Sequence, residues 1–277
     1  MKSTISHSYV IKLNIFGLVL FDIDGVIRDV SNSYRLASKK TVLKFCGWEP
    51  TSTDIDNLKN EGIWNNDWDL SLELIKRFIH KNNLLVPLPT KADIIRYFEQ
   101  LYFGCSPQEN YSKWNGFICN EEILIDTNIF NLFNTDKIGW GFVSGAEKPS
   151  ARFILEKRLN LNKPPLVAMG DAPDKPNPDG LIRLSKMLLK NELGSNTPPI
   201  VYVGDTIADV KTVINARKQI PNQSFISIAL APPHLYSINY KREREKYEIH
   251  LKNAGADIIL NSINDIQDLY RDIFFNQ

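Results

Sequence analysis

The sequence predicts an α/β protein built on a parallel sheet, with a helical domain inserted after the first strand. Short apolar runs rich in β-branched and aromatic residues indicate buried strands. Between the later runs lie segments of helical period, and strands that alternate with helices are typical of a parallel sheet covered on both faces. The predicted strands span residues 16–22, 138–145, 164–171, 199–205, 224–230 and 256–261.

Helices are expected between the later strands because apolar residues recur there at helical spacing. These helices span residues 150–159, 181–192 and 207–217. The stretch KREREKYE at residues 241–248 mixes positive and negative charges, which is typical of a solvated helical face.

The gap after the first predicted strand is too long for a single crossover. About 110 residues separate Asp24 from Ile138, whereas a crossover helix takes one to two dozen. The insert has the pattern of helices only, and Asn66 or Asp67 is the expected N-cap of the second. These helices span residues 31–45, 68–80 and 91–103. We therefore expect a separate helical domain here.

Composition favours chemistry on a small molecule. The chain has 277 residues with 33 Lys+Arg against 32 Asp+Glu, so a net charge of +1 gives no global field toward nucleic acid or an anionic membrane. Cys46, Cys105 and Cys119 form no CxxC pair, which fits a reducing compartment. The longest apolar stretch, residues 15–21, is far below the ~20 residues of a membrane span. Residues 1–14 lack a signal-peptide pattern, so we expect an extension there and a cytoplasmic location.

Carboxylates follow two of the predicted strands, where an open parallel sheet binds its ligands. Asp22 and Asp24 end the first run, spaced to share one face of a strand, and Gly25 then allows a tight turn. Asp205 and Asp209, in the sequence GDTIAD, suit a hard divalent cation. Each pair alone also has a structural interpretation, because acidic residues at these places cap helices or solvate loops.

Two further candidates point to a phosphate group. Ser144 and Gly145 end the second run with a hydroxyl and exposed N–H groups at the start of a helix, a common way to bind phosphate. Lys175 lies in the loop DKPNPDG, which its prolines stiffen. Each of these signals is weak by itself.

Taken together, the candidates form one ordered pattern: Asp22-x-Asp24, Ser144, Lys175 and Asp205-x-x-x-Asp209. This conjunction resembles the haloacid dehalogenase-like (HAD) superfamily. FDIDGVI, FVSG, KPNPDG and VGDTIAD are also similar to its branch with a helical cap, which includes phosphoglycolate phosphatases and β-phosphoglucomutases. The resemblance covers about residues 15–265. It implies a Rossmann-like core of residues 15–27 and 135–277 and a helical cap of residues 28–134.

The resemblance implies phosphoryl transfer through a covalent aspartyl-phosphate. Asp22 is then the nucleophile. Asp24 is the residue that protonates the leaving oxygen and afterwards accepts a proton from the attacking water. The presence of Asp24 favours phosphate esters over halogenated carbon compounds, because dehalogenases of this superfamily lack that second carboxylate.

The resemblance also implies a bound Mg²⁺, which offsets the repulsion between carboxylates and a phosphate dianion. Its implied ligands are Asp22, the backbone carbonyl of Asp24, Asp205 and Asp209, the last direct or through water. The implied holders of the phosphoryl oxygens are Ser144, the Gly145 N–H and Lys175, and Lys175 also counts among the catalytic residues.

Substrate choice is expected to reside in the cap, which closes over the core in capped members of the family. Arg28, Asn66 and Trp68 are the candidate specificity residues. The alternative for Asn66 is helix capping, and for Trp68 it is packing within the cap. Glu147, just after the phosphate-binding residues, either lines the entrance or solvates a helix start.

The function expected from the resemblance is a phosphatase acting on a small phosphorylated metabolite, with neither nucleic acid nor membrane as partner. One alternative is a sugar phosphomutase, which uses the same residues but returns the phosphoryl group to a substrate. A second alternative is an inactive homologue that serves as a binding or regulatory protein. The sequence fixes neither the substrate nor the oligomeric state.

Overall fold

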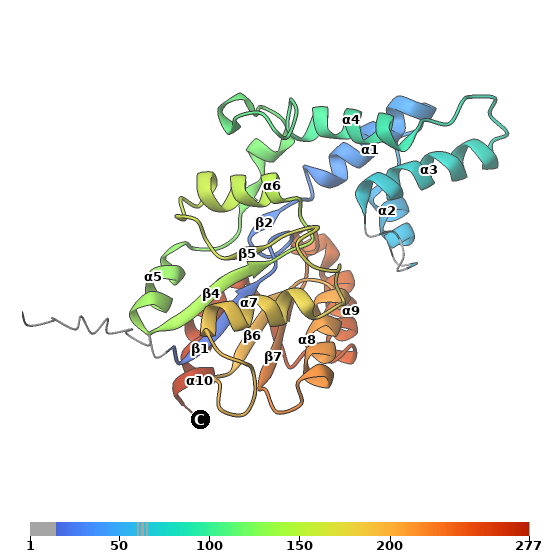
Figure 1. Ribbon diagram of the computed structural model, residues 1–277. Helices are drawn as coiled ribbons and strands as arrows, with labels where there is room; N and C mark the ends of the chain where they lie inside the picture. The colour runs from blue at the N-terminus through green and yellow to red at the C-terminus, as the bar shows by residue number, and fades with distance from the viewer. Residues whose placement is uncertain (1–14, 60, 62–63, 65, 277) are drawn as a thin grey trace, which may run out of the picture.

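The parallel sheet predicted from the sequence is confirmed in a computed structural model of the chain, which describes residues 15–59, 61, 64 and 66–276 (Figure 1). Residues 1–14, expected to form an extension, lie outside the described residues. Within the described part, the main sheet has six parallel strands in the order β5-β4-β1-β6-β7-β8. Their bounds are β1 (Gly17–Phe21), β4 (Ile138–Val143), β5 (Leu166–Val167), β6 (Ile200–Gly204), β7 (Phe225–Leu230) and β8 (Ile258–Leu260).

The central strands are buried on both faces, which explains their continuous apolar sequences. Every residue of β1 and of β6 is buried. Val19 and Phe21 of β1 contribute to one apolar core, and Leu18 and Leu20 contribute to another on the opposite face. This alternation follows from the two-residue period of a strand.

Helices cover both faces of the sheet (Figure 1). Residues of α7 and α8 pack with Leu18 and Leu20, while α5, α6 and α10 contribute to the core on the other face. The bounds are α5 (Asn128–Thr135), α6 (Lys148–Arg152), α7 (Asp179–Leu189), α8 (Ile207–Gln219), α9 (Lys241–Asn253) and α10 (Ile266–Phe275). The helix expected over 150–159 is α6 followed by a π-helical turn, Phe153–Arg158. No helix within the described ranges is long and apolar enough to span a membrane.

The helices of the insert pack around a core of their own, beyond the carboxyl end of the sheet (Figure 1). Leu70, Leu74 and Ile94 are among the residues buried there. The bounds are α1 (Tyr34–Cys46), α2 (Ser52–Lys59), α3 (Asp67–Lys81) and α4 (Lys91–Tyr102). We call these helices the cap.

The expectation that the insert holds helices only is wrong at its two edges. β2 (Arg28–Asp29), where the chain leaves the core, pairs antiparallel with β3 (Glu122–Ile123), where it returns. Two-residue strands are too short to produce a periodic pattern, so the sequence does not reveal them. The expected cap range of 28–134 also includes α5, which packs on β4.

Candidate active site

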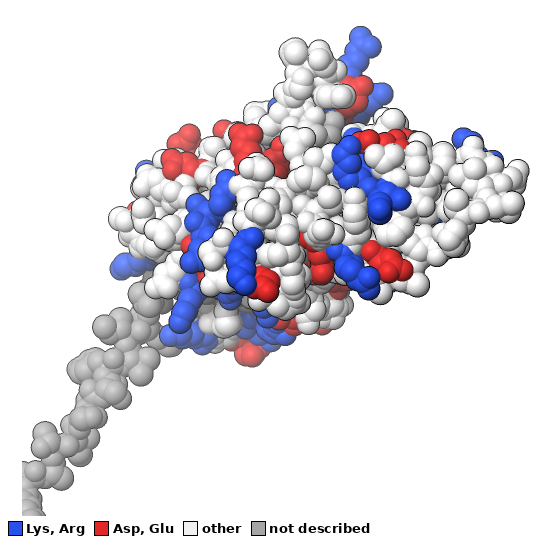
Figure 2. All heavy atoms as spheres, turned by 90° about the horizontal axis from the view of Figure 1, so that it is seen from above, with Lys and Arg blue, Asp and Glu red and all other residues white. Residues whose placement is uncertain are grey.

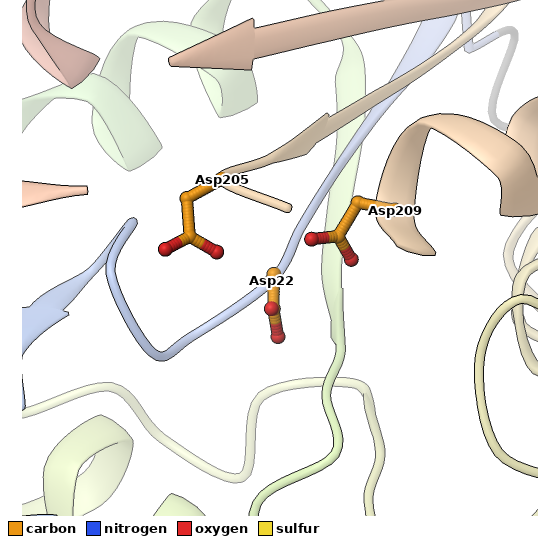
Figure 3. Close-up of side chains that lie close together, drawn as sticks. All are labelled: Asp22, Asp205 and Asp209. Carbon is orange, nitrogen blue, oxygen red and sulfur yellow. The ribbon is translucent and has the colours of Figure 1, made fainter. Parts of the chain in front are cut away.

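Three carboxylates from two neighbouring strands and a helix meet at the carboxyl end of the sheet (Figure 3). Asp22 follows β1, Asp205 follows β6, and Asp209 lies in the first turn of α8. Because β1 and β6 are parallel neighbours, their carboxyl ends lie side by side. One oxygen from each carboxylate lies within 4.8 Å of the others, and all three residues are buried.

Glycines allow the backbone to pass close to these carboxylates. Gly25 has a φ of +75°, and a Cβ at this position would lie 2.0 Å from Oδ2 of Asp205. A Cβ at Gly204 would lie 2.3 Å from Cβ of Asp209. Neither position can accept a side chain without displacing a site residue. The turn that follows Asp22 and Asp24 therefore lets the backbone at Gly25 pass close to Asp205.

Capping fixes the orientation of Asp209. The backbone N–H of Thr206 donates to Oδ2 of Asp209 at 3.0 Å, and the Thr206 hydroxyl donates to the same oxygen at 2.5 Å. This capping box leaves Oδ1 of Asp209 for other partners. Oδ1 accepts a hydrogen bond from the hydroxyl of Tyr202 at 3.1 Å, and the role of Asp209 as a metal ligand stays a prediction.

Lys175 lies between two of the carboxylates. Its Nζ is 2.8 Å from Oδ2 of Asp22 and 2.6 Å from Oδ1 of Asp209. The hydroxyl of Tyr202, a residue of β6, accepts a further hydrogen bond from Nζ at 3.2 Å. Burial by itself lowers the pKa of Lys175, but the nearby carboxylates of Asp209 and Asp22 raise it well above its ordinary value. The ammonium therefore stays charged and offsets part of the negative charge.

The negative charge of the site exceeds what Lys175 neutralises. Burial, opposed by Lys175 and reinforced by Asp209 and Asp24, raises the pKa of Asp22 to about 6. Burial and the carboxylates of Asp209 and Asp22 raise the pKa of Asp205 well above its ordinary value. Desolvated carboxylates close together favour protonation or a bound cation. Because all donor atoms are carboxylate oxygens, the set fits a hard cation such as Mg²⁺.

The phosphate-binding candidates follow β4, the other neighbour of β1. The register pairs Phe21 with Phe142, so Ser144 leaves the same end of the sheet as Asp22. Ser144 is buried, and its Oγ accepts a hydrogen bond from the backbone N–H of Ala146 at 3.1 Å. Gly145 is exposed, and a Cβ placed there would meet nothing within 4 Å. The space next to Gly145 is therefore open.

Asp24 stands apart from the other carboxylates. Its Oδ1 accepts a hydrogen bond from Nε of Arg28 at 2.6 Å, and 30% of its side chain is exposed. Arg28 is fully buried, and its guanidinium also donates to Tyr102 and Glu121. Protein groups thus surround the guanidinium, and a contact between Arg28 and the substrate stays a prediction.

The two other specificity candidates have structural roles in the cap. The Asn66 side chain accepts hydrogen bonds from the backbone N–H groups of Trp68 at 2.9 Å and Asp69 at 3.2 Å, so it caps α3. Trp68 is half-buried and packs against the apolar cores of both the cap and the sheet. These contacts match the alternative interpretation of the sequence, and a role in substrate binding stays a prediction.

Two polar residues of this region belong to no motif that the sequence reveals. Tyr202 lies within the apolar run of β6, where its hydroxyl is hidden among strand-forming residues. Glu121, the buried partner of Arg28, lies in the segment that returns to the core and belongs to no recognised motif. The contact of Tyr202 with Lys175 and that of Glu121 with Arg28 each join residues far apart in the sequence. Local sequence patterns therefore do not reveal them.

Glu147 carries a carboxylate whose ionisation is disfavoured by its surroundings. Burial and, to a lesser extent, Glu99 of the cap helix α4 raise the pKa of Glu147 from 4.5 to about 7. The folded state therefore binds this proton more tightly than the unfolded state, so ionised Glu147 lowers stability above neutral pH. This cost disappears as the pH falls through 7 toward 4.5, because both states then become protonated.

Replacing Glu147 with Gln is expected to stabilise the protein at alkaline pH. After discounting for partial exposure, we expect a gain of about 1–2 kcal/mol in the free energy of unfolding near pH 8. This gain should largely vanish near pH 5. Urea unfolding at both pH values measures it, with Glu122→Gln at an exposed position as the matched control. An equal gain at the two pH values would contradict the assigned cause.

Comparisons with known proteins agree with the architecture. No family model matches the chain. A curated relative, an imidazoleglycerol-phosphate dehydratase from Phytophthora nicotianae, is 30% identical over 173 residues, which cover 61% of this chain and 36% of that protein. The matched segment thus spans little more than a third of that relative.

Solved structures match over nearly the whole chain. A phosphonoacetaldehyde hydrolase-like protein from Oleispira antarctica is 15% identical with a TM-score of 0.63, covering 98% of this chain and 96% of its own. CbbY from Rhodobacter sphaeroides, solved with phosphate, is 17% identical with a TM-score of 0.60, covering 91% and 96%. A HAD hydrolase of family IA from Entamoeba histolytica is 16% identical with a TM-score of 0.58, covering 90% and 95%.

Other matching structures are phosphoglycolate phosphatase-like and β-phosphoglucomutase-like proteins. The chain therefore has the fold of the HAD-like hydrolases, including the capped branch that its motifs resemble. At these identities the likeness shows the fold, and the chemistry has to be argued from the site.

Proposed function

We propose that the chain is a Mg²⁺-dependent phosphatase that hydrolyses a small phosphorylated metabolite through a phosphoaspartate on Asp22. The observation that supports this most strongly is the buried cluster of Asp22, Asp205 and Asp209 with Lys175 among them. Asp22 is a buried carboxylate beside the ammonium of Lys175 and beside carboxylate oxygens that can bind a metal ion. Such a carboxylate is suited to attack a phosphate ester.

The proposed reaction has two steps. A carboxylate oxygen of Asp22 attacks phosphorus, the ester P–O bond breaks, and the departing oxygen takes a proton from Asp24. Water then attacks the phosphorus of the phosphoaspartate and gives a proton to Asp24. The bond between phosphorus and the Asp22 oxygen breaks, and its electron pair returns to the carboxylate. Phosphate leaves, and both side chains are restored.

Charge neutralisation is the task of the surrounding residues. Asp22, Asp205, Asp209 and the backbone carbonyl of Asp24 would hold Mg²⁺, which offsets the negative charge of the phosphate. Lys175 would keep Asp22 ionised and, with Ser144 and Gly145, hold the phosphoryl oxygens. Closure of the cap would exclude bulk water.

The near-neutral charge supports a free metabolite as substrate rather than a nucleic acid or a membrane. Figure 2 shows basic and acidic side chains interspersed over the face seen there. Cys46, Cys105 and Cys119 are free thiols, which supports the proposed cytoplasmic location.

Phosphate release from a panel of phosphorylated metabolites, with Mg²⁺ and with a chelator, tests the proposed function. The panel should include imidazoleglycerol phosphate, because that compound appears in the name of the curated relative. We expect the chelator to stop release and Lys175→Met to lower it at least about a hundredfold. Lys186→Met, at a more exposed lysine paired with Glu192, should change it by less than about twofold. Release that survives Lys175→Met would contradict the proposal.

A sugar phosphomutase is the second candidate, favoured by the structural likeness to a β-phosphoglucomutase-like protein. The same panel separates the two activities through their products. A phosphatase yields inorganic phosphate, whereas a mutase yields an isomerised sugar phosphate. An inactive binding protein would yield neither.

A further inference from the structure

We propose that Arg28 is a positioning residue that holds the carboxylate of Asp24 for proton transfer, with Glu121 fixing Arg28 in turn. This inference rests on the proposed function, because it concerns the acid–base group of that reaction. It assigns a role to a buried cation whose ion pairs are with Asp24 and Glu121 and not with Asp22, Asp205 or Asp209.

All three nitrogen atoms of the Arg28 guanidinium donate hydrogen bonds. Nε donates to Oδ1 of Asp24 at 2.6 Å, and Nη1 donates to Tyr102 and to Oε2 of Glu121, each at 2.9 Å. Nη2 donates to Oγ of Ser150 at 3.3 Å. These partners come from the loop after β1, from α4, from the segment before β3 and from α6. A rigid planar fork held at four points has little freedom to move.

Glu121 is itself firmly held. Its side chain is fully buried, and Oε1 accepts hydrogen bonds from the hydroxyls of Tyr102 at 3.0 Å and Ser33 at 2.5 Å. Its backbone carbonyl accepts a hydrogen bond from Arg158 at 2.8 Å. Glu121, in the segment just before β3, therefore holds the guanidinium of Arg28, and Arg28 holds the carboxylate of Asp24.

This arrangement suits an acid–base group. With Oδ1 of Asp24 occupied by Arg28, Oδ2 is the oxygen left to exchange a proton with the leaving group and with water. A general acid must stay within hydrogen-bond reach of the atom it protonates, and a small misplacement costs much of its effect. A partly exposed aspartate would otherwise rotate freely about its side-chain bonds.

The test compares two esters of similar shape, para-nitrophenyl phosphate and phenyl phosphate. Nitrophenolate leaves readily without a proton, whereas phenolate leaves less readily and gains more from a general acid. The ratio of kcat/KM for the two esters therefore reports the effectiveness of Asp24. A change that merely loosens the fold lowers both values together and leaves this ratio unchanged.

The informative variant is the double substitution Arg28→Met with Glu121→Gln. It removes both buried charges together, because removing one partner alone leaves an uncompensated charge and threatens folding. We expect the ratio to shift against phenyl phosphate by at least about fivefold. Arg28→Lys, which keeps the charge but loses the fork, should give a smaller shift in the same direction.

The matched control is Arg217→Met with Asp257→Asn, which removes an ion pair remote from Asp24. Its ratio should equal that of the unaltered chain, and Asp24→Asn gives the largest shift to be expected. An unchanged ratio in the Arg28 double variant, with a shifted ratio in Asp24→Asn, would overturn the role of Arg28 alone. If Asp24→Asn leaves the ratio unchanged, the acid–base role of Asp24 fails and the role of Arg28 with it. If the unaltered chain releases phosphate neither from these esters nor from any compound of the metabolite panel, the proposed function itself fails.

Discussion

Asp22→Asn is expected to abolish phosphate release, lowering kcat/KM at least about a thousandfold. An amide oxygen is a poor nucleophile, and the substitution also removes one charged oxygen from the proposed metal set. The variant should nonetheless fold. Because the folded state raises the pKa of Asp22 to about 6, the ionised carboxylate lowers stability at neutral pH, and the amide avoids that cost.

Steady-state phosphate release with saturating Mg²⁺ measures this loss. Asp174→Asn is the matched control, because Asp174 is an exposed carboxylate next to Lys175 in the chain. We expect the control to retain activity to within about twofold. An Asp22→Asn variant that keeps a substantial share of the activity would show that another group attacks the phosphorus.

Asp205→Asn is expected to move stability and activity in opposite directions. Burial and the charges of Asp209 and Asp22 raise the pKa of Asp205, so the ionised group destabilises the metal-free fold at neutral and alkaline pH. Removing this charge should raise the melting temperature of the metal-free protein by a few degrees. The same change removes a metal ligand, so Mg²⁺-dependent activity should be lost.

Thermal unfolding with chelator and with Mg²⁺ tests both halves of this prediction. Mg²⁺ should raise the melting temperature of the unaltered chain and of Asp174→Asn, because a ligand that binds the folded state stabilises it. It should leave Asp205→Asn unaffected. A metal-free Asp205→Asn protein that melts lower, or that still responds fully to Mg²⁺, would contradict the role assigned to the cluster.

The main sheet and its site residues were predictable because both depend on short segments of sequence. Strands buried on both faces, such as β1 and β6, are continuous apolar runs, and parallel strands bring their ends together. Once the apolar runs before Asp22 and Asp205 are identified as parallel strands, both residues are expected at the carboxyl end of the sheet. The ordered motifs supplied what periodicity does not, namely the expected task of each residue.

The surroundings of Arg28 were not predictable for a physical reason. A charged residue just after a turn is expected at the surface. Its burial depends on Tyr102 and Glu121, which lie far along the chain and come close only when the cap has folded. The two-residue strands β2 and β3 depend on the same long-range approach.

The most direct test of the central claim is to trap phosphorylated Asp22. In Asp24→Asn, para-nitrophenyl phosphate should still transfer its phosphoryl group, because its leaving group needs little help from an acid. The phosphoenzyme should then accumulate, because no base activates the water. Rapid acid quenching and peptide mass spectrometry should find one added phosphoryl group on Asp22. A phosphoryl group on another residue, or none despite a burst of nitrophenolate, would contradict the account.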